Sequence, residues 1–233
     1  MRLLIRTVLK RIINRAEGRL DQDRLNEHRE QLRKYWSEGS VRMQRTLDVP
    51  SFGRLFEDDG KPIELRQLHN RFGWQSGART HCAGAFYRTE NFMNTAEPCA
   101  VKAEGQNIHI EHTVTISELM QAIPEMPRRN RQEFLIHLLG LSVTTGVTDG
   151  LDGERKTMVR PGMATRSRVL DRNHVSQNRP FCRYDPKKHS PIWDLVTGKK
   201  VDAETFNLGQ HRANLKVALG WSGLDDWIRF LAA

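Results

Sequence analysis

Residues 107–116, with the sequence NIHIEHTVTI, decide the fold class, because they form the clearest strand pattern in the chain. Side chains on a strand alternate between its two faces, so every second residue shares a face. One face carries the apolar set together with one histidine, namely Ile108, Ile110, His112, Val114 and Ile116. The other face carries the polar set, namely His109, Glu111, Thr113 and Thr115. The pattern therefore predicts a strand.

Helical patterns follow this strand along the chain. We expect Ser117 to be the N-cap of a short helix that Pro124 soon ends. Residues 131–141 predict a second helix, because their apolar residues recur at helical spacing. Residues 144–153 are rich in glycine and predict a loop with several turns. The mixture of strand and helix patterns predicts the α+β class.

The amino-terminal part of the chain has its own pattern. Apolar residues recur every four positions at Leu4, Val8 and Ile12, which is typical of an amphipathic helix, and Lys and Arg are frequent between them. We expect two parts, a basic helical arm at residues 1–50 and a mixed domain at residues 51–233. In the second part we expect a central short β-hairpin with flanking helices.

Composition limits the classes of protein that the chain can belong to. The 233 residues carry a formal net charge of +9, which favours polyanionic partners through long-range attraction and counterion release. Three cysteines at irregular spacing do not form a secreted disulfide framework. No apolar stretch approaches the ~20 residues of a membrane span. We therefore expect a cytoplasmic protein that does not enter the membrane.

Most of the excess charge lies in residues 155–189, where ten Lys and Arg face only Asp171 and Asp185. Arginine forks suit phosphate oxygens, and nearby aromatic rings can stack on bases. This stretch, together with one earlier arginine, predicts a nucleic-acid-binding surface. The candidate contacts are Arg88, Arg166, Arg168, Arg172, Arg179, Arg183, Lys187 and Lys188.

The adjacent Glu111 and His112 suit hydrolytic chemistry if both reach one site. A glutamate can ligate a divalent metal ion through hard oxygen atoms, and a histidine can take a proton from an attacking water. Because neighbours on a strand point to opposite faces, a bulge or a strand end is needed to bring them together. The alternative is that His112 faces the core and bonds to a backbone carbonyl.

Glu111-His112 within IHIEHTVTI resembles the acidic residue and histidine that open the HNH, or ββα-metal, endonuclease motif. Residues 178–189, NRPFCRYDPKKH, are similar to a degraded form of the Asn, Pro, Cys and His tail of that family. The resemblance implies one Mg2+ or Mn2+ ion held by Glu111, with His112 as general base. It further implies that Asn178 orients the base and that His174 or His189 completes the metal site.

The chain departs from the HNH pattern in two ways. His112 and Asn178 are 66 positions apart, so an insertion is required between them. The zinc-binding Cys-x-x-Cys pair is absent, and the cysteines Cys82, Cys99 and Cys182 contain no close pair, so structural zinc is not expected.

We therefore expect a metal-dependent endonuclease that hydrolyses DNA phosphodiester bonds, with RNA left open as a substrate and a homodimer as an open assembly state. The alternative from another class is a non-catalytic nucleic-acid-binding protein, such as a regulator or a packaging factor. A third alternative is a structural protein that assembles through residues 1–48.

Overall fold

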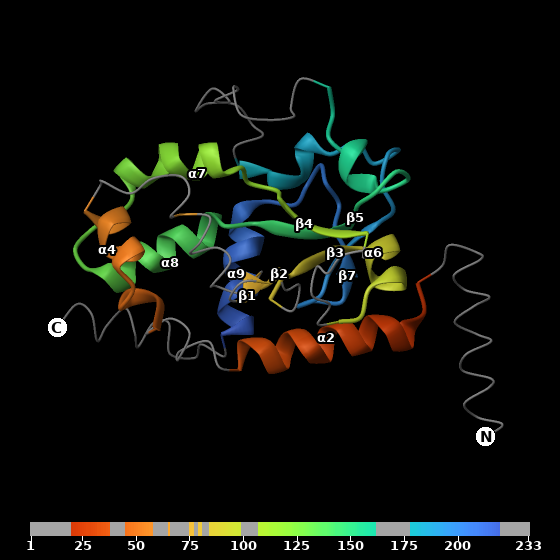
Figure 1. Cartoon of the computed structure of the whole chain (residues 1–233), viewed down its shortest axis with the longest axis horizontal. Helices are drawn as coiled ribbons and strands as arrows, with labels where there is room; N and C mark the ends of the chain where they lie inside the picture. Colours follow the sequence, from red (N-terminus) through yellow and green to blue (C-terminus); the bar gives the residue numbers. More distant parts are fainter. Residues whose placement is uncertain are drawn as a thin grey trace.

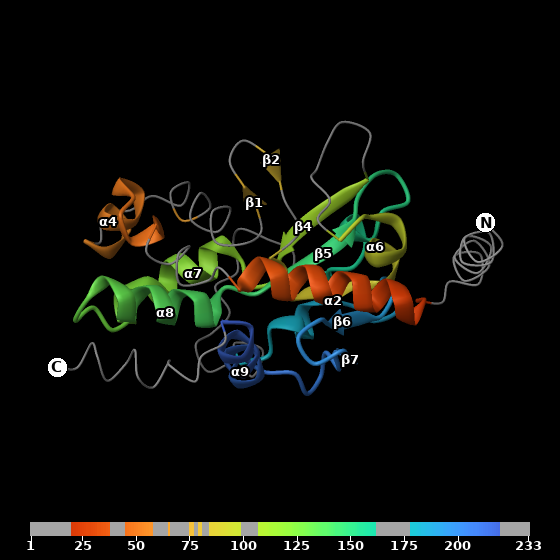
Figure 2. The same cartoon turned by 90° about the horizontal axis from the view of Figure 1, so that it is seen from below.

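The computed structural model of the chain describes residues 20–37, 45–57, 65, 75–76, 79–80, 84–98, 107–161 and 178–219. In these ranges the α+β class is confirmed, because helices pack around a mixed sheet (Figure 1). Both views place three helices together at one end of the molecule, namely α4 (Pro50–Phe56), α7 (Ile116–Ala122) and α8 (Arg131–Leu141) (Figure 2). The other helices are α2 (Gln22–Trp36), α6 (Glu90–Thr95) and α9 (Leu208–Ala218).

The main sheet is more extensive than the predicted hairpin. Its five strands lie in the order β4-β5-β3-β6-β7. Their bounds are β3 (Tyr87–Thr89), β4 (Ile108–His112), β5 (Thr144–Thr148), β6 (Ile192–Asp194) and β7 (Lys199–Lys200). β5 pairs in parallel with β3 and antiparallel with β4, whereas β6 pairs antiparallel with both β3 and β7. A separate two-stranded sheet is formed by β1 (Gln75–Ser76) and β2 (Arg79–Thr80).

β5 corrects the prediction of a loop at residues 144–153. Its sequence TTGVT is rich in β-branched residues, which favour strands, and four of its five residues are buried. Gly146 had suggested a turn, but here it allows a close approach. A Cβ at this position would lie 3.3 Å from the Phe92 ring of α6. Only residues 149–153, which follow the strand, form the predicted turn.

The strand predicted at residues 107–116 is confirmed but shorter, because Thr115 already caps the next helix, and the helices after it are confirmed with one shift of a helix cap. β4 covers residues 108–112, and α8 begins and ends where its pattern predicted. The N-cap of α7 is Thr115 rather than Ser117. Thr115 and Glu118 form a capping box, in which each side chain accepts a hydrogen bond from the other's backbone N–H. Ser117 cannot form such a reciprocal pair, because Met120 stands three residues after it.

α2 belongs to the same core as the sheet. Its buried apolar side chains, namely Leu25, Leu32, Tyr35 and Trp36, join one cluster with residues of the sheet and of α8. The Trp36 indole N–H donates to the Gly84 carbonyl 3.1 Å away. Helix α2 of the predicted amino-terminal arm is therefore packed on the body of the protein, and the helix predicted around Leu4, Val8 and Ile12 lies outside the described residues.

Candidate functional site

His109 and Glu111 lie on one face of β4 and contact each other. His109 Nε2 is 3.6 Å from Glu111 Oε2, and the side chains are 22% and 18% exposed. This contact agrees with the alternation predicted from the sequence. A histidine beside a carboxylate can take part in proton transfer, because the carboxylate orients the ring and stabilises its charged form. The pair is thus a candidate acid–base centre.

His112 lies on the opposite face from Glu111. The ladder pairs Glu111 with Thr145 and His112 with Thr144 in an unbroken register. Adjacent residues of a regular strand point to opposite faces, and this ladder contains no bulge that would turn one of them. The strand itself therefore does not bring together the two neighbours on which the HNH resemblance rests.

The Glu111 carboxylate is largely buried among charged groups. Burial raises the pKa of Glu111 above its ordinary value, while the positive charges of Arg183 and Arg155 partly oppose that rise. Arg183 Nη2 lies 3.5 Å from Glu111 Oε1. The contacts of Glu111 with His109 and Arg183 are both longer than the 2.7–3.2 Å of a good N–H···O bond. Both carboxylate oxygens can therefore accept a closer partner.

The segment that resembles the HNH tail lies directly against the end of β4. Arg183 Nη1 donates to the carbonyl oxygens of His112 at 2.9 Å and of Thr113 at 3.1 Å. The Tyr184 hydroxyl donates to Thr113 Oγ1 at 3.0 Å. Arg183 ends the 3-10 turn η5 (Pro180–Arg183). Two segments about 70 residues apart in the sequence thus form one structural unit.

Residues 158–160 pair with residues 183–185 beside the end of β4. These two short segments lie before and after residues 162–177. Val159 and Tyr184 form an antiparallel bridge. The Arg160 N–H donates to the Arg183 carbonyl at 2.8 Å, and the Asp185 N–H donates to the Met158 carbonyl at 2.7 Å. The predicted site residues Arg166, Arg168, Arg172 and His174 lie outside the described residues.

The other predicted residues of segment 178–189 differ from one another in exposure and in hydrogen-bond partners. Asn178 is exposed, as are Lys187 and Lys188. Arg179 Nη1 donates to the Glu204 carbonyl at 2.6 Å. His189 Nδ1 lies 2.7 Å from the Ser190 carbonyl, and its ring is 6.0 Å from the Tyr184 ring. His189 therefore packs beside the same tyrosine that contacts the end of β4.

Arg88 corrects the prediction of a surface phosphate contact, because its side chain is fully buried. Its Nη1 bonds to His28 Nδ1 and donates to the Pro98 carbonyl at 2.8 Å, and its guanidinium lies 5.6 Å from the centre of the Phe92 ring. Burial and the neighbouring positive charges of Arg88 and Arg24 lower the pKa of His28 to about 2. Arg88 therefore helps to fix α2 to the sheet.

Glu111 is a possible ligand for a divalent cation, with His109 and Arg183 beside it. Within the described ranges, no three His, Cys, Asp or Glu side chains gather as a metal site. Zinc takes three or four protein ligands, whereas Mg2+ keeps several waters and often uses one or two carboxylates together with substrate phosphates. Glu111 supplies such a carboxylate, and His109 supplies a neighbouring nitrogen.

Glu154 is a buried acidic residue that the sequence pattern did not single out. Its carboxylate accepts hydrogen bonds from the hydroxyls of Thr89, Thr148 and Ser190, and from the Asn91 amide. It also accepts the Ser190 backbone N–H at 2.6 Å. These donors come from β3, α6, β5 and the segment before β6, so Glu154 joins them beside the basic residues 187–188.

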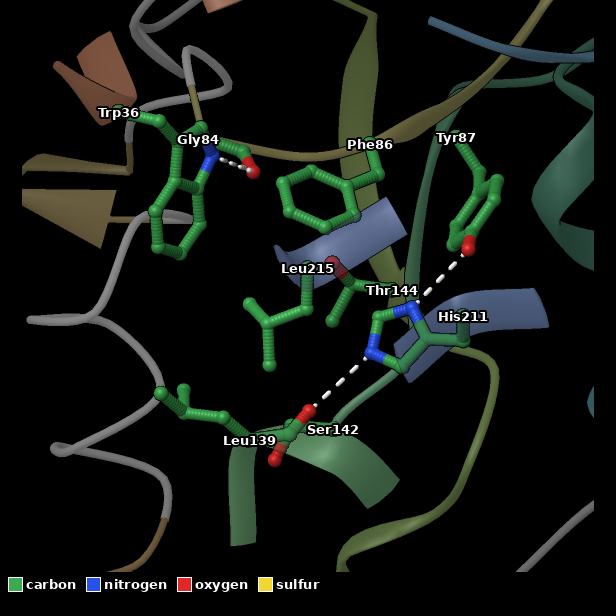
Figure 3. Close-up of a pocket in the computed structure, with 9 residues that line it drawn as sticks. All are labelled: Trp36, Gly84, Phe86, Tyr87, Leu139, Ser142, Thr144, His211 and Leu215. Carbon is green, nitrogen blue, oxygen red and sulfur yellow. Dashed lines mark hydrogen bonds between the residues drawn. The ribbon is translucent and has the colours of Figure 1, made fainter. Parts of the chain in front are cut away.

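A small pocket in the interior contains a second histidine pair (Figure 3). His211 Nε2 lies 3.1 Å from the Leu139 carbonyl, and Nδ1 lies 2.9 Å from the Tyr87 hydroxyl. Because a carbonyl only accepts, Nε2 carries the proton and the tyrosine donates to Nδ1. Burial lowers the pKa of His211 to about 4, so the ring is neutral. The lining residues are Trp36, Gly84, Phe86, Tyr87, Leu139, Ser142, Thr144, His211 and Leu215.

Sequence reasoning singled out Glu111 but not its partner His109. The signal was available, since a spacing of two on a strand places both on one face. Among the described helices, none has the length and apolar character needed to cross a membrane. Comparisons with family models, with curated proteins and with solved structures found no match to this chain.

Proposed function

We propose that this protein is a metal-dependent endonuclease that hydrolyses phosphodiester bonds in DNA, with His109 and Glu111 as its central pair. The observation that carries the proposal is their contact at 3.6 Å on the face of β4 that Arg183 also reaches. The HNH resemblance pointed to the same strand, but the alternation of side chains favours His109 over His112 as the base.

His109, Glu111 and the nearby lysines have different roles in the proposed reaction. His109 takes a proton from a water that attacks phosphorus, and the bond from phosphorus to the leaving oxygen breaks. Glu111 would hold an Mg2+ or Mn2+ ion, and such an ion would supply polarisation of the phosphoryl group and stabilisation of the charge on the leaving oxygen. The exposed cations Lys156, Lys187 and Lys188 bind the nucleic-acid backbone.

The experiment that tests this proposal compares two histidines of one strand. Supercoiled plasmid is incubated with the wild type, His109→Ala and His112→Ala, each with Mg2+, with Mn2+ and with EDTA. We expect metal-dependent nicking by the wild type and a loss of about 10²-fold or more in His109→Ala, as for removal of a general base. His112→Ala should retain most of the activity, because its side chain lies on the other face.

Two results would contradict the assignment in different ways. Loss of nicking in His112→Ala with activity kept in His109→Ala would restore His112 as the base. Plasmid that is retarded on the gel but never nicked would favour the non-catalytic nucleic-acid-binding protein. The ion pair of Glu111 with Arg183 supports this second candidate, because an arginine already partly neutralises the carboxylate.

A further inference from the structure

Leu151 is an unusual surface residue, because this large apolar side chain is 94% exposed. It lies in the turn that joins β5 to the 3-10 turn η3 (Glu154–Lys156). Single exposed leucines are common on protein surfaces and need no special role. Leu151 differs from such residues in the way the chain holds its turn and in the charged residues that surround it.

The turn that carries Leu151 is firmly held. The Asp149 N–H donates to the Asn107 carbonyl at 2.7 Å, and the Asp149 side chain accepts from Gly150 N–H at 3.0 Å and from Arg155 at 3.0 Å. Gly150 has a φ of +102°, and a Cβ there would lie 2.9 Å from the Asn107 side chain. The backbone that carries Leu151 is therefore held by its neighbours, so it loses little freedom when it binds a partner.

Basic residues lie beside this turn and connect it to the proposed site. Arg155, Lys156, Lys187 and Lys188 are exposed, and the Thr157 hydroxyl donates to the Lys188 carbonyl at 3.3 Å, which joins the two basic segments. Arg155 also lies near enough to Glu111 to oppose the rise of its pKa. Asp149 is neutralised by Arg155, so Asp152 is the exposed acidic residue of the turn that opposes a polyanion.

We propose that Leu151 is a wedge that inserts between stacked base pairs of a DNA duplex held by Lys156, Lys187 and Lys188. This inference rests on the proposed function, because it requires that DNA binds at this face. Apolar wedges such as leucine unstack a base step and kink the duplex, while neighbouring cations hold the phosphates. The class of ligand is thus double-stranded DNA that is distorted on binding.

The test uses a short duplex that contains 2-aminopurine, whose fluorescence rises when it is unstacked. We expect the wild type to raise the fluorescence, and Leu151→Ala to reduce that rise by about threefold or more and to weaken binding by roughly tenfold, as expected when a wedge is removed. Val217→Ala is the matched control, because Val217 is 69% exposed on α9. It should behave as the wild type.

The outcomes separate this inference from the proposed function. A wild type that binds and nicks the plasmid without raising the fluorescence would overturn the wedge and leave the nuclease intact. Equal fluorescence with Leu151→Ala and the wild type would do the same. Absence of any binding to DNA would overturn both. Self-association in sedimentation that Leu151→Ala abolishes, with DNA binding unchanged, would assign the residue to a second copy of this chain and reject the wedge.

Discussion

The outer pair, His109 with Glu111, and the inner pair, Tyr87 with His211, use histidine in opposite ways. In the outer pair the contact is long, 3.6 Å, and both side chains are partly exposed. In the inner pair both ring nitrogens of the buried histidine have hydrogen-bond partners at 2.9 Å and 3.1 Å. A buried ring whose two nitrogens both have hydrogen-bond partners stabilises the fold, whereas a partly exposed ring beside a carboxylate is a candidate for proton transfer.

The largest difference between the two pairs should appear when each histidine is removed. His211→Ala leaves a cavity and deprives the buried Tyr87 hydroxyl and Leu139 carbonyl of their partner, so we expect a loss of about 3 kcal/mol or more in the free energy of unfolding. His109→Ala should cost less than about 1 kcal/mol. Urea unfolding of both variants at pH 7 measures the difference. Equal losses would mean that the outer pair is also structural.

The next largest effect is the pH dependence of stability that arises from protonation of His211 in the inner pair. Burial lowers the pKa of His211 from 6.5 to about 4, so the unfolded chain takes up a proton in this range before the folded chain does. Stability should therefore fall as the pH drops from 6.5 to 4, and this histidine accounts for roughly 3 kcal/mol of the loss. His28, whose pKa is about 2, adds to the fall in the same direction.

This pH dependence can be assigned with one variant. His211→Gln cannot titrate, so its stability relative to that of the wild type should improve as the pH falls from 7 to 4. The His28 contribution is present in both proteins and cancels in the difference. The measurement is the urea unfolding free energy at pH 7, 5.5 and 4. Parallel curves for the two proteins would show that His211 is not the group that titrates.

A smaller difference in stability is expected between Tyr87→Phe, at the inner pair, and Tyr184→Phe, at the end of β4. Tyr87→Phe removes the donor to His211 Nδ1 and leaves that buried acceptor unsatisfied, so we expect a loss of about 1–3 kcal/mol. Tyr184 is buried beside the end of β4, and its hydroxyl donates to Thr113 Oγ1, which also lies 2.7 Å from Thr145 Oγ1. Tyr184→Phe should cost about 1 kcal/mol or less, because Thr113 keeps a partner. Thermal unfolding of both variants gives the ranking, and the reverse order would contradict it.

The sequence predicted those parts of the molecule that local patterns determine. The alternation at residues 108–112 gave the strand and the shared face of His109 and Glu111, and the apolar spacing at residues 131–141 gave α8. β5 was missed, because its glycine suggested a turn while the Phe92 ring that packs on it lies more than 50 positions away. Arg183 could not be placed beside Glu111 from spacing alone, and Arg88 could not be recognised as buried, since both depend on contacts between distant segments.

The smallest expected effect is the change in the unfolding free energy of Glu111→Gln. An increase indicates that the Glu111 carboxylate serves function, whereas a decrease indicates that it stabilises the fold. Burial raises the pKa of Glu111, so the charged form is disfavoured in the folded state at neutral pH. A neutral glutamine of the same shape should therefore raise the unfolding free energy slightly at pH 7. The gain should vanish below the pKa of the unfolded carboxyl, where glutamate is neutral in both states.

Glu154→Gln is the matched control for this last measurement. Its carboxylate accepts hydrogen bonds from several buried donors, and an amide places an N–H where one of them points. We expect Glu154→Gln to lose about 1–3 kcal/mol in urea unfolding, whereas Glu111→Gln gains stability and loses nicking. A Glu111→Gln variant that loses both stability and activity would mean that its carboxylate serves the fold, as that of Glu154 does. Gain of stability with loss of cleavage is instead the behaviour of a charge that is kept for function at some cost to the fold.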